Sequence, residues 1–327
     1  MSSEFALGIV GAGAIGAVHI ETAMALPKVR LAAVCDAREE VAKAVAERTG
    51  ARCHTEFRNL AYEERLDGVI VCTPPATHPE IGQFFLRSGI NVLCEKPLAI
   101  DARSAVKMQA CAKRNRRLLM LASKFRYVEG VVAARQILRE GTLGAIRHAE
   151  IVFTSNVDMR ARWNSDPAQS GGGVVIDNGS HAADICRYLF GPVVSVAAVG
   201  YTRVAELAVE DSAYLYLGTQ DGTGVTVDVS WSLERHLPYY IRIYGEHGRL
   251  CVGWRETTLS LNPSIAATRI APGYSKIEAF RAVQEDFVNA SSGSGVPRID
   301  AADGLASVEV IDAAYEAIRE GGRREVA

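Results

Sequence analysis

Residues 5–122 alternate between short apolar runs rich in β-branched side chains and longer segments in which apolar residues recur at helical spacing. The apolar runs are FALGIV, VRLAAVC, GVIVCT, INVLCE and RLLMLAS. Strands that are apolar on both faces and separated by helices indicate a parallel sheet covered on both sides. Residues 1–122 are therefore predicted to form a doubly wound α/β domain.

The rhythm changes after about residue 123, where strand-like segments follow one another through tight turns. The pairs are SAYLYLGT with VTVDVSWS across QDGTG, and YYIRIYG with RLCVGW across EHG. Strands joined by such short turns run antiparallel. Residues 123–327 are therefore predicted to form a second α/β domain, a large and mostly antiparallel open sheet with helices on one face near 128–140, 177–190, 277–291 and 302–321.

The composition argues against several classes of function. With 48% hydrophobic and 23% charged residues the chain is an ordinary globular protein, and its net charge of −2 gives no electrostatic reason to bind nucleic acid. No apolar stretch reaches the roughly 20 residues that span a bilayer, and the N-terminus lacks the basic region of a secretory signal. The seven cysteines are scattered without a CxxC pair and the histidines show no ligand spacing, so we expect a reduced cytoplasmic protein without a bound metal.

GAGAIG, residues 11–16, follows the first predicted strand and opens the first predicted helix. Gly11 makes the tight turn, Gly13 lets the main chain approach a pyrophosphate, and Gly16 lets helix and strand pack closely. The first helical residues, Ala14 and Ile15, present main-chain N–H groups and the positive end of the helix dipole to the phosphates. The loop therefore predicts a dinucleotide site, with a glycine-rich turn that binds nothing as the alternative.

The second apolar run, VRLAAVC, is followed directly by Asp36, which lies 20 residues beyond the last glycine of the loop. A carboxylate at this place hydrogen-bonds the ribose 2′-hydroxyl and repels a 2′-phosphate, which favours NAD over NADP. Arg38 either contacts the adenine or a phosphate, or is a surface residue of the next helix. NADP therefore stays open as the minority alternative.

Two further loops follow strands at the edge where open α/β sheets bind ligands. The run GVIVCT ends at Thr73 and is followed by Pro74 and Pro75, and the strand must end here because two successive prolines cannot continue a sheet ladder. His78 then either contacts the cofactor or caps the next helix. Glu95 and Lys96 end the run INVLCE in front of a proline that holds the pair in a rigid turn. Lys96 is suited to stabilising negative charge on a substrate oxygen, and the alternative is a surface salt bridge.

SGGGVVIDNGSHAADICRYLFG, residues 170–191, combines three glycines with a predicted helix. Asp177 and His181 are four residues apart and Asp184 follows three residues later, so all three lie near one helix face. A histidine accepts a proton near neutral pH, and a neighbouring carboxylate fixes its orientation. The glycines at 171–173 would let the main chain pass close to a ligand. The alternative is that Asp177 caps the helix and His181 is a half-buried structural residue.

Taken together, these motifs resemble the Gfo/Idh/MocA family of NAD(P)-dependent oxidoreductases. The resemblance rests on GIVGAGAIG, CTPPATH, CEKPLA, GTLG, SGGGVVIDNGSHAADICRYLFG and IYGEHGRL, in this order over nearly the whole chain. It implies a Rossmann domain followed by an α/β domain whose open sheet is buried in homodimers or homotetramers. It also implies reversible oxidation of a secondary hydroxyl of a sugar, cyclitol or related polyol by hydride transfer to nicotinamide.

The resemblance also assigns roles to residues. In that family the lysine of the EKP motif and the aspartate and histidine of the DxxxH segment are catalytic, which implies these roles for Lys96, Asp177 and His181. His181 would take the hydroxyl proton and contact the substrate, Lys96 would orient the hydroxyl, and the two would converge on one carbon. Asn178 is expected to contact the substrate as well.

Two segments depart from the family pattern or are ambiguous. Where many members carry an arginine pair, this chain has SKFRY at 123–127, so Lys124 either projects into the site or is a strand-edge charge. The loop at 155–173 contains Trp163, which is suited to covering a sugar face. This loop is either a lid or an oligomer contact, and its Arg160 and Arg162 either bind an anionic group or are simply solvated.

Two other functions stay open from the sequence. One is an enzyme that holds NAD permanently and transfers hydride between two sugars, or uses transient oxidation to cleave a glycoside. The other is a dinucleotide-sensing protein that kept the fold without catalysis.

Overall fold

The computed structural model describes residues 4–204, 206–264 and 266–326, and it divides into two compact units. The first unit comprises Met1–Lys124 and Lys276–Leu305, and the second comprises Phe125–Ser275 and Ala306–Ala327. The first unit thus includes residues 276–305, which the sequence analysis assigned to the second domain. The domain boundary between residues 122 and 123 stays a prediction.

The first unit is built on a six-stranded parallel sheet in the order β3-β2-β1-β4-β5-β6. The strands are β1 (Phe5–Val10), β2 (Val29–Cys35), β3 (Arg52–His54), β4 (Gly68–Val71), β5 (Asn91–Glu95) and β6 (Leu119–Ala122). Every residue of β1, β4 and β6 is buried, as expected for strands covered on both faces. The predicted doubly wound parallel sheet is therefore confirmed.

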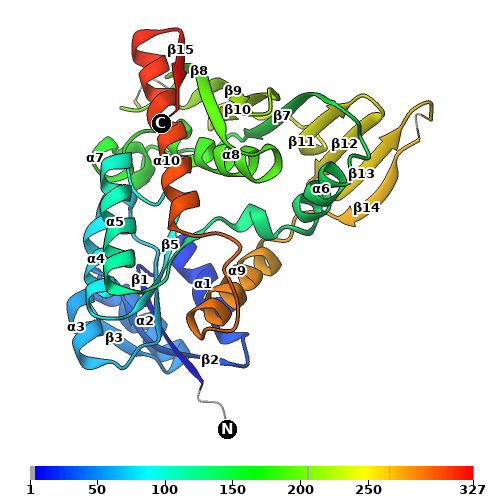
Figure 1. The fold of residues 1–327 in the computed structure, drawn as a ribbon. Coiled ribbons are helices and arrows are strands. Elements are labelled where there is room, and N and C mark those ends of the chain that lie inside the picture. The colour runs from blue at the N-terminus through cyan, green and yellow to red at the C-terminus, as the bar shows by residue number, and fades with distance from the viewer. Residues whose placement is uncertain (1–3, 205, 265, 327) are drawn as a thin grey trace. The chain divides into compact units, whose positions relative to one another are not determined.

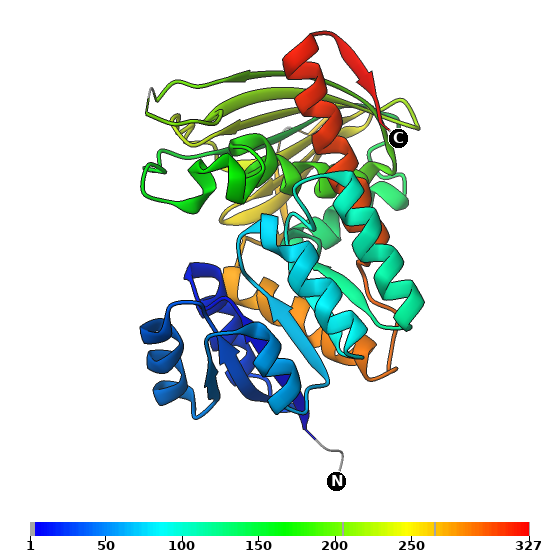
Figure 2. The same cartoon turned by 90° about the vertical axis from the view of Figure 1, so that its left-hand side faces the viewer.

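The helices between these strands begin and end at recognisable signals. They are α1 (Ala14–Met24), α2 (Glu39–Thr49), α3 (Phe57–Glu63), the short 3₁₀ helix η1 (Pro75–Thr77), α4 (His78–Arg87) and α5 (Ala102–Asn115). Helix α2 has two glutamates in its first turn and ends at Gly50 in the left-handed conformation. The Asp101 carboxylate caps α5 by accepting the Ser104 N–H at 2.8 Å. Figure 2 shows α4 and α5, in cyan and teal, packed side by side.

The strand order reverses between β1 and β4, so the connections from these two strands leave toward opposite sides of the sheet. Such a switch point opens a crevice at the carboxyl ends of the strands, where open α/β sheets bind ligands. The glycine loop follows β1, Thr73 and Pro74 follow β4, and Lys96 follows β5. These predicted site segments therefore lie along one edge of one sheet.

One helix packs in a place that the sequence analysis did not expect. Helix α9 (Lys276–Ser291) was predicted to cover the second sheet, but it packs against α1 in the first unit. Figure 1 shows α9, in orange, beside the blue α1. Phe280 of α9 packs edge-on against the ring of His19 on α1 at 4.8 Å. Helical spacing predicts that a helix forms, but it does not predict which sheet the helix covers, so this part of the prediction is wrong.

The second unit contains a nine-stranded sheet in the order β14-β13-β12-β11-β7-β10-β9-β8-β15. The strands are β7 (Ile146–Thr154), β8 (Val193–Tyr201), β9 (Ser212–Thr219), β10 (Gly224–Ser230), β11 (Tyr239–Gly245), β12 (Gly248–Gly253), β13 (Glu256–Leu261), β14 (Thr268–Pro272) and β15 (Arg323–Glu325). Both predicted hairpins, β9 with β10 and β11 with β12, are antiparallel as expected. Among the described strands of this second sheet, only the central pair of β7 and β10 is parallel, so the mostly antiparallel sheet is confirmed.

Helices cover one face of this second sheet. The helices that contact its strands are α6 (Glu129–Arg139) and α8 (Val174–Phe190). The unit also contains the short α7 (Pro167–Ser170), the later part of α10 (Ala301–Glu320), the 3₁₀ helix η3 (Trp163–Ser165) and, apart from Lys124, the 3₁₀ helix η2 (Lys124–Tyr127). Helices α6 and α8 contact each other as well as the sheet, which places both on the same face. Figure 2 shows α8, in green, lying along the strands. Among the described residues, no helix is both long and apolar enough to pass through a membrane.

Candidate active site

The glycine loop leaves space at the start of α1. A Cβ placed on Gly13 would meet no heavy atom within 4 Å. Among the described residues no side chain caps this helix end, and its first turn, which includes the exposed Ala14 and the half-buried Ile15, has no acidic residue. An open space in front of uncapped N–H groups at the positive end of a helix fits a pyrophosphate.

The other two glycines of the loop are required by packing. Gly11 has a positive φ of 91°, and a Cβ there would lie 2.8 Å from the main-chain carbonyl of Cys72 at the end of β4. A Cβ on Gly16 would lie 2.0 Å from the carbonyl oxygen of Gly11. The loop can therefore fold tightly against β4 and α1 only because these side chains are absent.

Asp36 is tied to this loop from the end of β2. Its Oδ2 accepts the Ala12 N–H at 2.9 Å, and its Oδ1 accepts the Arg38 main-chain N–H at 3.0 Å and the Arg38 Nε–H at 3.1 Å. Burial raises the pKa of Asp36, but the hydrogen bonds from Arg38 and Ala12 outweigh burial and hold the pKa below its ordinary value. The carboxylate is therefore ionised at neutral pH, with the exposed Arg38 folded over it.

His78 lies at the end of the loop after β4. It begins α4 and is fully buried, and its Nδ1 and Nε2 lie 2.9 and 2.8 Å from the carbonyl oxygens of Pro97 and Thr73. Burial lowers the pKa of His78 below its ordinary value. The ring thus joins the loop after β4 to the loop after β5, while Thr73 and Pro74 stay half-buried at the edge of the sheet. Direct contact between His78 and a cofactor stays a prediction.

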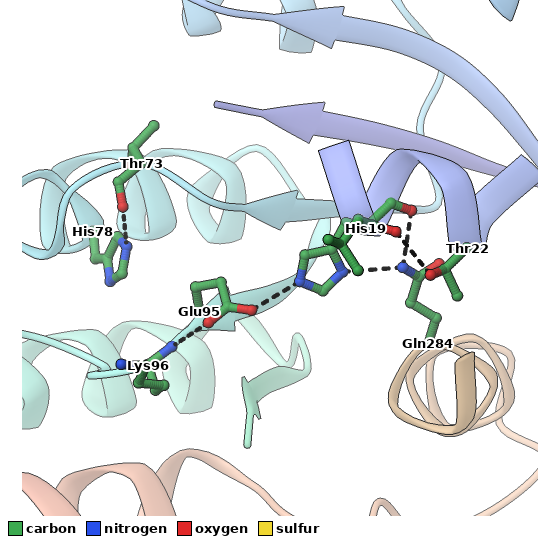
Figure 3. A network of polar contacts seen from close by, with 8 residues as sticks. His19, Thr22, Thr73, His78, Glu95, Lys96 and Gln284 are labelled. Carbon is green, nitrogen blue, oxygen red and sulfur yellow. Dashed lines mark hydrogen bonds and ion pairs between the residues drawn. The ribbon is translucent and has the colours of Figure 1, made fainter. Parts of the chain in front are cut away.

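Glu95 and Lys96 form the turn at the end of β5. The Glu95 side chain is buried, its Oε2 accepts the Lys96 main-chain N–H at 3.1 Å, and its Oε1 lies 2.9 Å from Nε2 of His19 (Figure 3). Lys96 itself is half-buried. Lys124, at the start of η2, belongs to the same unit, and its Nζ lies 5.4 Å from the centre of the Phe280 ring.

In the second unit, α8 carries the other predicted catalytic side chains. Asp177 lies in the first turn of the helix and His181 one turn later, so both project from the same face, and both are half-buried. Asn178 donates its Nδ2–H to the Phe153 carbonyl at 3.2 Å, which links α8 to β7. The N-cap position is Gly173, so the alternative in which Asp177 caps the helix is wrong.

The start of α8 differs from the start of α1, because the protein itself occupies its N–H groups. Glu210 Oε1 accepts the N–H groups of Gly173 and Val175, and the Glu210 carbonyl accepts that of Val174. The Tyr315 hydroxyl donates to Glu210 Oε1 at 2.8 Å. Cβ atoms on Gly172 and Gly173 would overlap Tyr315 and Glu210 respectively. These two glycines let the main chain approach Tyr315 and Glu210, whereas the sequence analysis expected them to approach a ligand.

Asp184 also has a different role from the one considered in the sequence analysis. Its carboxylate accepts the Arg126 Nε–H at 2.9 and 3.1 Å, and Arg126 Nη2 lies 2.6 Å from Oδ1. The two side chains are only 1% and 5% exposed. Asp184 thus anchors η2 to α8. Its carboxylate, which the sequence analysis considered as a partner for His181, is paired with the Arg126 guanidinium instead.

The sequence analysis missed an aromatic cluster around His181. The cluster comes from five segments of the second unit and consists of Phe125, Phe153, Tyr240, Trp254 and Tyr274. The Phe125 ring meets the His181 ring edge-on at 5.0 Å, and Trp254 at the far side of the cluster is 42% exposed. No local pattern predicts this cluster, because its members are brought together only when the sheet forms.

The 155–173 loop is ordered around short elements. Arg160 pairs with the exposed Asp158 at 2.8 Å, so one of its two arginines has a partner in the loop itself. Trp163 begins η3 and is 40% exposed. Its roles as a lid or as an oligomer contact stay predictions.

The structure therefore gathers the predicted residues in two sets, each within its own unit. The cofactor residues, with Lys96, lie along the carboxyl edge of the six-stranded sheet. Asp177, Asn178 and His181 lie on α8. Among the described residues, no group of His, Cys, Asp or Glu side chains is arranged to hold a metal ion.

Parts of both units match models of known protein families. Residues 5–123 match the model of an oxidoreductase family with an NAD-binding Rossmann fold, and residues 131–251 match the C-terminal domain model of the GFO/IDH/MocA family. The rhizopine catabolism protein MocA of Rhizobium meliloti is 30% identical, with 96% of this chain and 95% of that protein covered. Inositol 2-dehydrogenase 2 of Saccharopolyspora erythraea is 28% identical over 98% of this chain and 95% of that enzyme.

A solved structure extends this likeness to three dimensions. The aldose-aldose oxidoreductase of Caulobacter crescentus, complexed with glycerol, superposes with a TM-score of 0.89 at 25% identity, covering 98% of this chain and 99% of that one. The matches cover residues of both units. The chain therefore belongs to the Gfo/Idh/MocA family of oxidoreductases, and residues 5–123 are the NAD-binding Rossmann domain of that family.

Proposed function

We propose that this protein reversibly oxidises a secondary hydroxyl of a sugar, cyclitol or related polyol with NAD as the hydride acceptor. The observation that carries the proposal is α8, where the half-buried His181 stands one turn after Asp177 and against an aromatic cluster. A general base held in this way suits removal of a proton from an alcohol.

The residues of the first unit that would hold the dinucleotide are those that frame the open space at the start of α1. The N–H groups of Gly13, Ala14 and Ile15 would bind the pyrophosphate, and the ionised Asp36 would bind the adenosine ribose. The loops at Thr73, Pro74 and Glu95 would border the nicotinamide half. When bound, NAD supplies the acceptor for the hydride. NADP stays the minority alternative, because Arg38 could accommodate a 2′-phosphate.

The chain's own residues would do the acid–base and orienting work. His181 would remove the hydroxyl proton, Asp177 would orient His181 or a second hydroxyl, and Lys96 would hydrogen-bond the reacting oxygen and stabilise its negative charge. The aromatic cluster ending in Trp254, together with Trp163, would pack on the apolar C–H face of a sugar ring. Lys124 and Asn178 are proposed to bind further hydroxyls. The name of one relative, inositol 2-dehydrogenase 2, supports a cyclitol-like substrate.

The test is NAD reduction measured across a panel of inositols, aldoses, uronates and sugar phosphates, followed by the reverse reaction with keto-sugars. On the best substrate, His181→Ala and Lys96→Met should each lower kcat by about 100-fold or more, because each removes one general-base or electrostatic contribution. Both variants should bind NAD with unchanged affinity. The matched controls are the exposed residues His236→Ala and Lys107→Met, which should keep full activity. Near-normal turnover by His181→Ala would refute its role.

A second candidate function is supported by the likeness to the aldose-aldose oxidoreductase. In this case the protein would keep its NAD and pass hydride from one sugar to another. Dialysed protein, denatured after purification, would then release about one NAD(H) per chain and would not turn over added NAD. A protein purified without nucleotide, but active with added NAD, would exclude this candidate.

We also propose that the protein is a homodimer or homotetramer through the open face of the nine-stranded sheet. Val199, Tyr214 and Tyr216 are 47–51% exposed there, next to a hollow of about 660 Å³ on β7–β10. Exposed aromatic side chains gathered on one face are typical of protein interfaces. The double variant Tyr214→Lys/Tyr216→Lys should sediment as a monomer, whereas Tyr62→Lys, at a 74% exposed tyrosine of α3, should not change the mass. An unmodified protein that already sediments as a monomer would refute the proposal.

The proposed compartment is the cytoplasm. All seven cysteines are free thiols, which supports a reducing environment. Thiol titration of freshly isolated, unfolded protein should count seven thiols, and a lower count that dithiothreitol restores would contradict the proposal.

A further inference from the structure

Three side chains from separate parts of the first unit form a buried chain of hydrogen bonds that ends at the Lys96 turn. Figure 3 shows Gln284 of α9, His19 of α1 and Glu95 of β5 in line, with the main chain of Lys96 at the end. His19 is fully buried, Gln284 is 1% exposed and Glu95 is 6% exposed. Three contacts in this chain pair a donor with an acceptor, whereas the buried Oε1 of Gln284 has no hydrogen-bond partner among the described residues.

The two contacts of Gln284 fix its orientation. One amide end lies 3.0 Å from the carbonyl oxygen of His19 and 3.0 Å from Nδ1 of the same residue. A carbonyl oxygen only accepts hydrogen bonds, so the amide atom that faces it must be the NH₂ group. The second N–H of that group then points at Nδ1, which must accept it.

The tautomer of His19 follows directly. Because Nδ1 accepts a hydrogen bond, it carries no proton, and the ring is neutral with its proton on Nε2. Nε2 lies 2.9 Å from Glu95 Oε1, so it donates to that carboxylate. The Phe280 ring packs edge-on against the imidazole at 4.8 Å and shields it from water.

Glu95 is ionised in this arrangement. Its pKa lies below the ordinary value although burial raises it; the hydrogen bond from His19 is the main lowering cause, and the positive charges of Lys96 and Lys124 act in the same direction. With His19 neutral, the pair keeps one negative charge beside the two lysines. The second carboxylate oxygen accepts the Lys96 N–H at 3.1 Å, so the position of Glu95 sets the path of the main chain there.

We propose that Gln284 and His19 are positioning residues for the reaction, because Gln284 fixes His19 as the Nε2–H tautomer and His19 fixes the carboxylate that holds the Lys96 turn. The inference rests on the role proposed for Lys96. Helix α9, which packs against α1 in the first unit, thus supplies the residue that sets the protonation of a buried histidine on α1.

The first experiment does not depend on activity. Nuclear magnetic resonance of the full-length protein labelled with ¹⁵N in its histidine rings, with NAD added, should show His19 with one proton on Nε2 at pH 7.5, assigned by its loss in His19→Gln. In Gln284→Glu the new carboxylate faces Nδ1 and should place a proton there. A wild-type His19 protonated on Nδ1 would overturn the inference, whatever the enzyme's substrate is.

The second experiment measures kinetics on the best substrate. His19→Leu removes the donor to a buried carboxylate and should lower kcat by about 10- to 100-fold, with the Kd for NAD and the KM within about threefold of wild type. His19→Gln, whose amide can donate in place of Nε2, should restore most of the rate. A rate for His19→Leu within twofold of wild type, or no rescue by His19→Gln in a protein that still binds NAD, would overturn the inference.

The matched control lies at the other end of the same strand. Asn91 begins β5, donates to the Asp67 carbonyl and accepts the Leu118 N–H. Asn91→Ala should lower the melting temperature but leave kcat unchanged. If Asn91→Ala lowers kcat as much as His19→Leu does, the effect of His19 is general destabilisation and the inference fails. If the wild type turns over no member of the panel, the proposed function fails while the tautomer experiment still stands.

Discussion

The buried ion pair of Arg126 with Asp184 gives the sharpest test of how the second unit is held together. The guanidinium makes contacts of 2.6, 2.9 and 3.1 Å to the carboxylate, and the side chains are 5% and 1% exposed. Arg126→Met leaves the Asp184 charge in a site of low dielectric without the guanidinium. Breaking a buried pair in this way costs about 3–5 kcal/mol, because the remaining charge keeps its desolvation penalty.

The double variant measures how much of the lost stability comes from the interaction between the two charges. Removing both charges in Arg126→Met/Asp184→Ala removes the desolvation penalty too, so the free energy of unfolding should fall by at least about 2 kcal/mol less than the sum of the two single variants. The matched control is Arg203→Met. The Arg203 guanidinium lies 5.1 Å from the Tyr201 ring, much as that of Arg126 lies 5.2 Å from the Tyr188 ring, but Arg203 is exposed. It should cost less than about 1 kcal/mol.

The assay is urea unfolding followed by tryptophan fluorescence. All three tryptophans lie in the second unit, so the signal reports that unit. A loss of about 3–5 kcal/mol corresponds to roughly 6–20 °C in melting temperature for a unit of this size. Single variants that cost under about 1 kcal/mol, or costs that simply add in the double variant, would refute the reasoning.

Three further predictions concern the cofactor loop and the start of α8. Gly13→Ala should leave the melting temperature unchanged but weaken NAD binding measured by titration, because its Cβ fills the open space. Gly16→Ala, whose Cβ would overlap the Gly11 carbonyl oxygen, should lower the melting temperature as well as the affinity for NAD. Equal effects of the two variants would contradict this difference. Asp36→Ala should raise the ratio of kcat/KM with NADP to that with NAD by about 10-fold or more, through loss of the ribose hydrogen bond and of the like charge; a wild type that uses both cofactors equally would count against it. Burial raises the pKa of the Glu210 carboxyl group in the folded state. The folded protein therefore holds the carboxyl proton more tightly than the unfolded chain does. Folding stability is then lost as the pH rises from the ordinary glutamate range through the raised pKa. Glu210→Gln keeps the acceptor for the α8 N–H groups and should remove this loss in urea unfolding across pH, whereas an unchanged pH dependence would show that Glu210 is not its source.

Much of the first unit could be predicted because its signals are local. A strand buried on both faces reads as one apolar run, and the turn after it must use glycine or proline where the main chain bends or approaches a neighbour. The glycine loop, Asp36 and the Lys96 turn were therefore located from the order of runs and turns alone. Their chemistry as catalytic and cofactor residues stays a proposal until the variants are measured.

The errors share a different physical cause. The glycines before α8 were expected to face a ligand, but Glu210 and Tyr315 fill the space beside them. A glycine shows only that something approaches the main chain, and a residue 37 positions away supplied the partner. Asp184 was grouped with His181 by helical spacing, but its charge required a buried cation, which Arg126 provides from 58 positions away.

The sequence by itself determined the parallel sheet, the hairpins of the second sheet and the positions of the loops at the carboxyl edge of the parallel sheet, since each depends on neighbours within one or two elements. Only the tertiary structure decided that α9 packs on α1, that Gln284 sets the tautomer of His19, and that an aromatic cluster lies against His181. The physical reason is that these contacts join segments up to 265 positions apart, and many helices of similar amphipathic pattern could occupy the same surface. Only packing, burial and the matching of donors with acceptors in the folded chain select one of them.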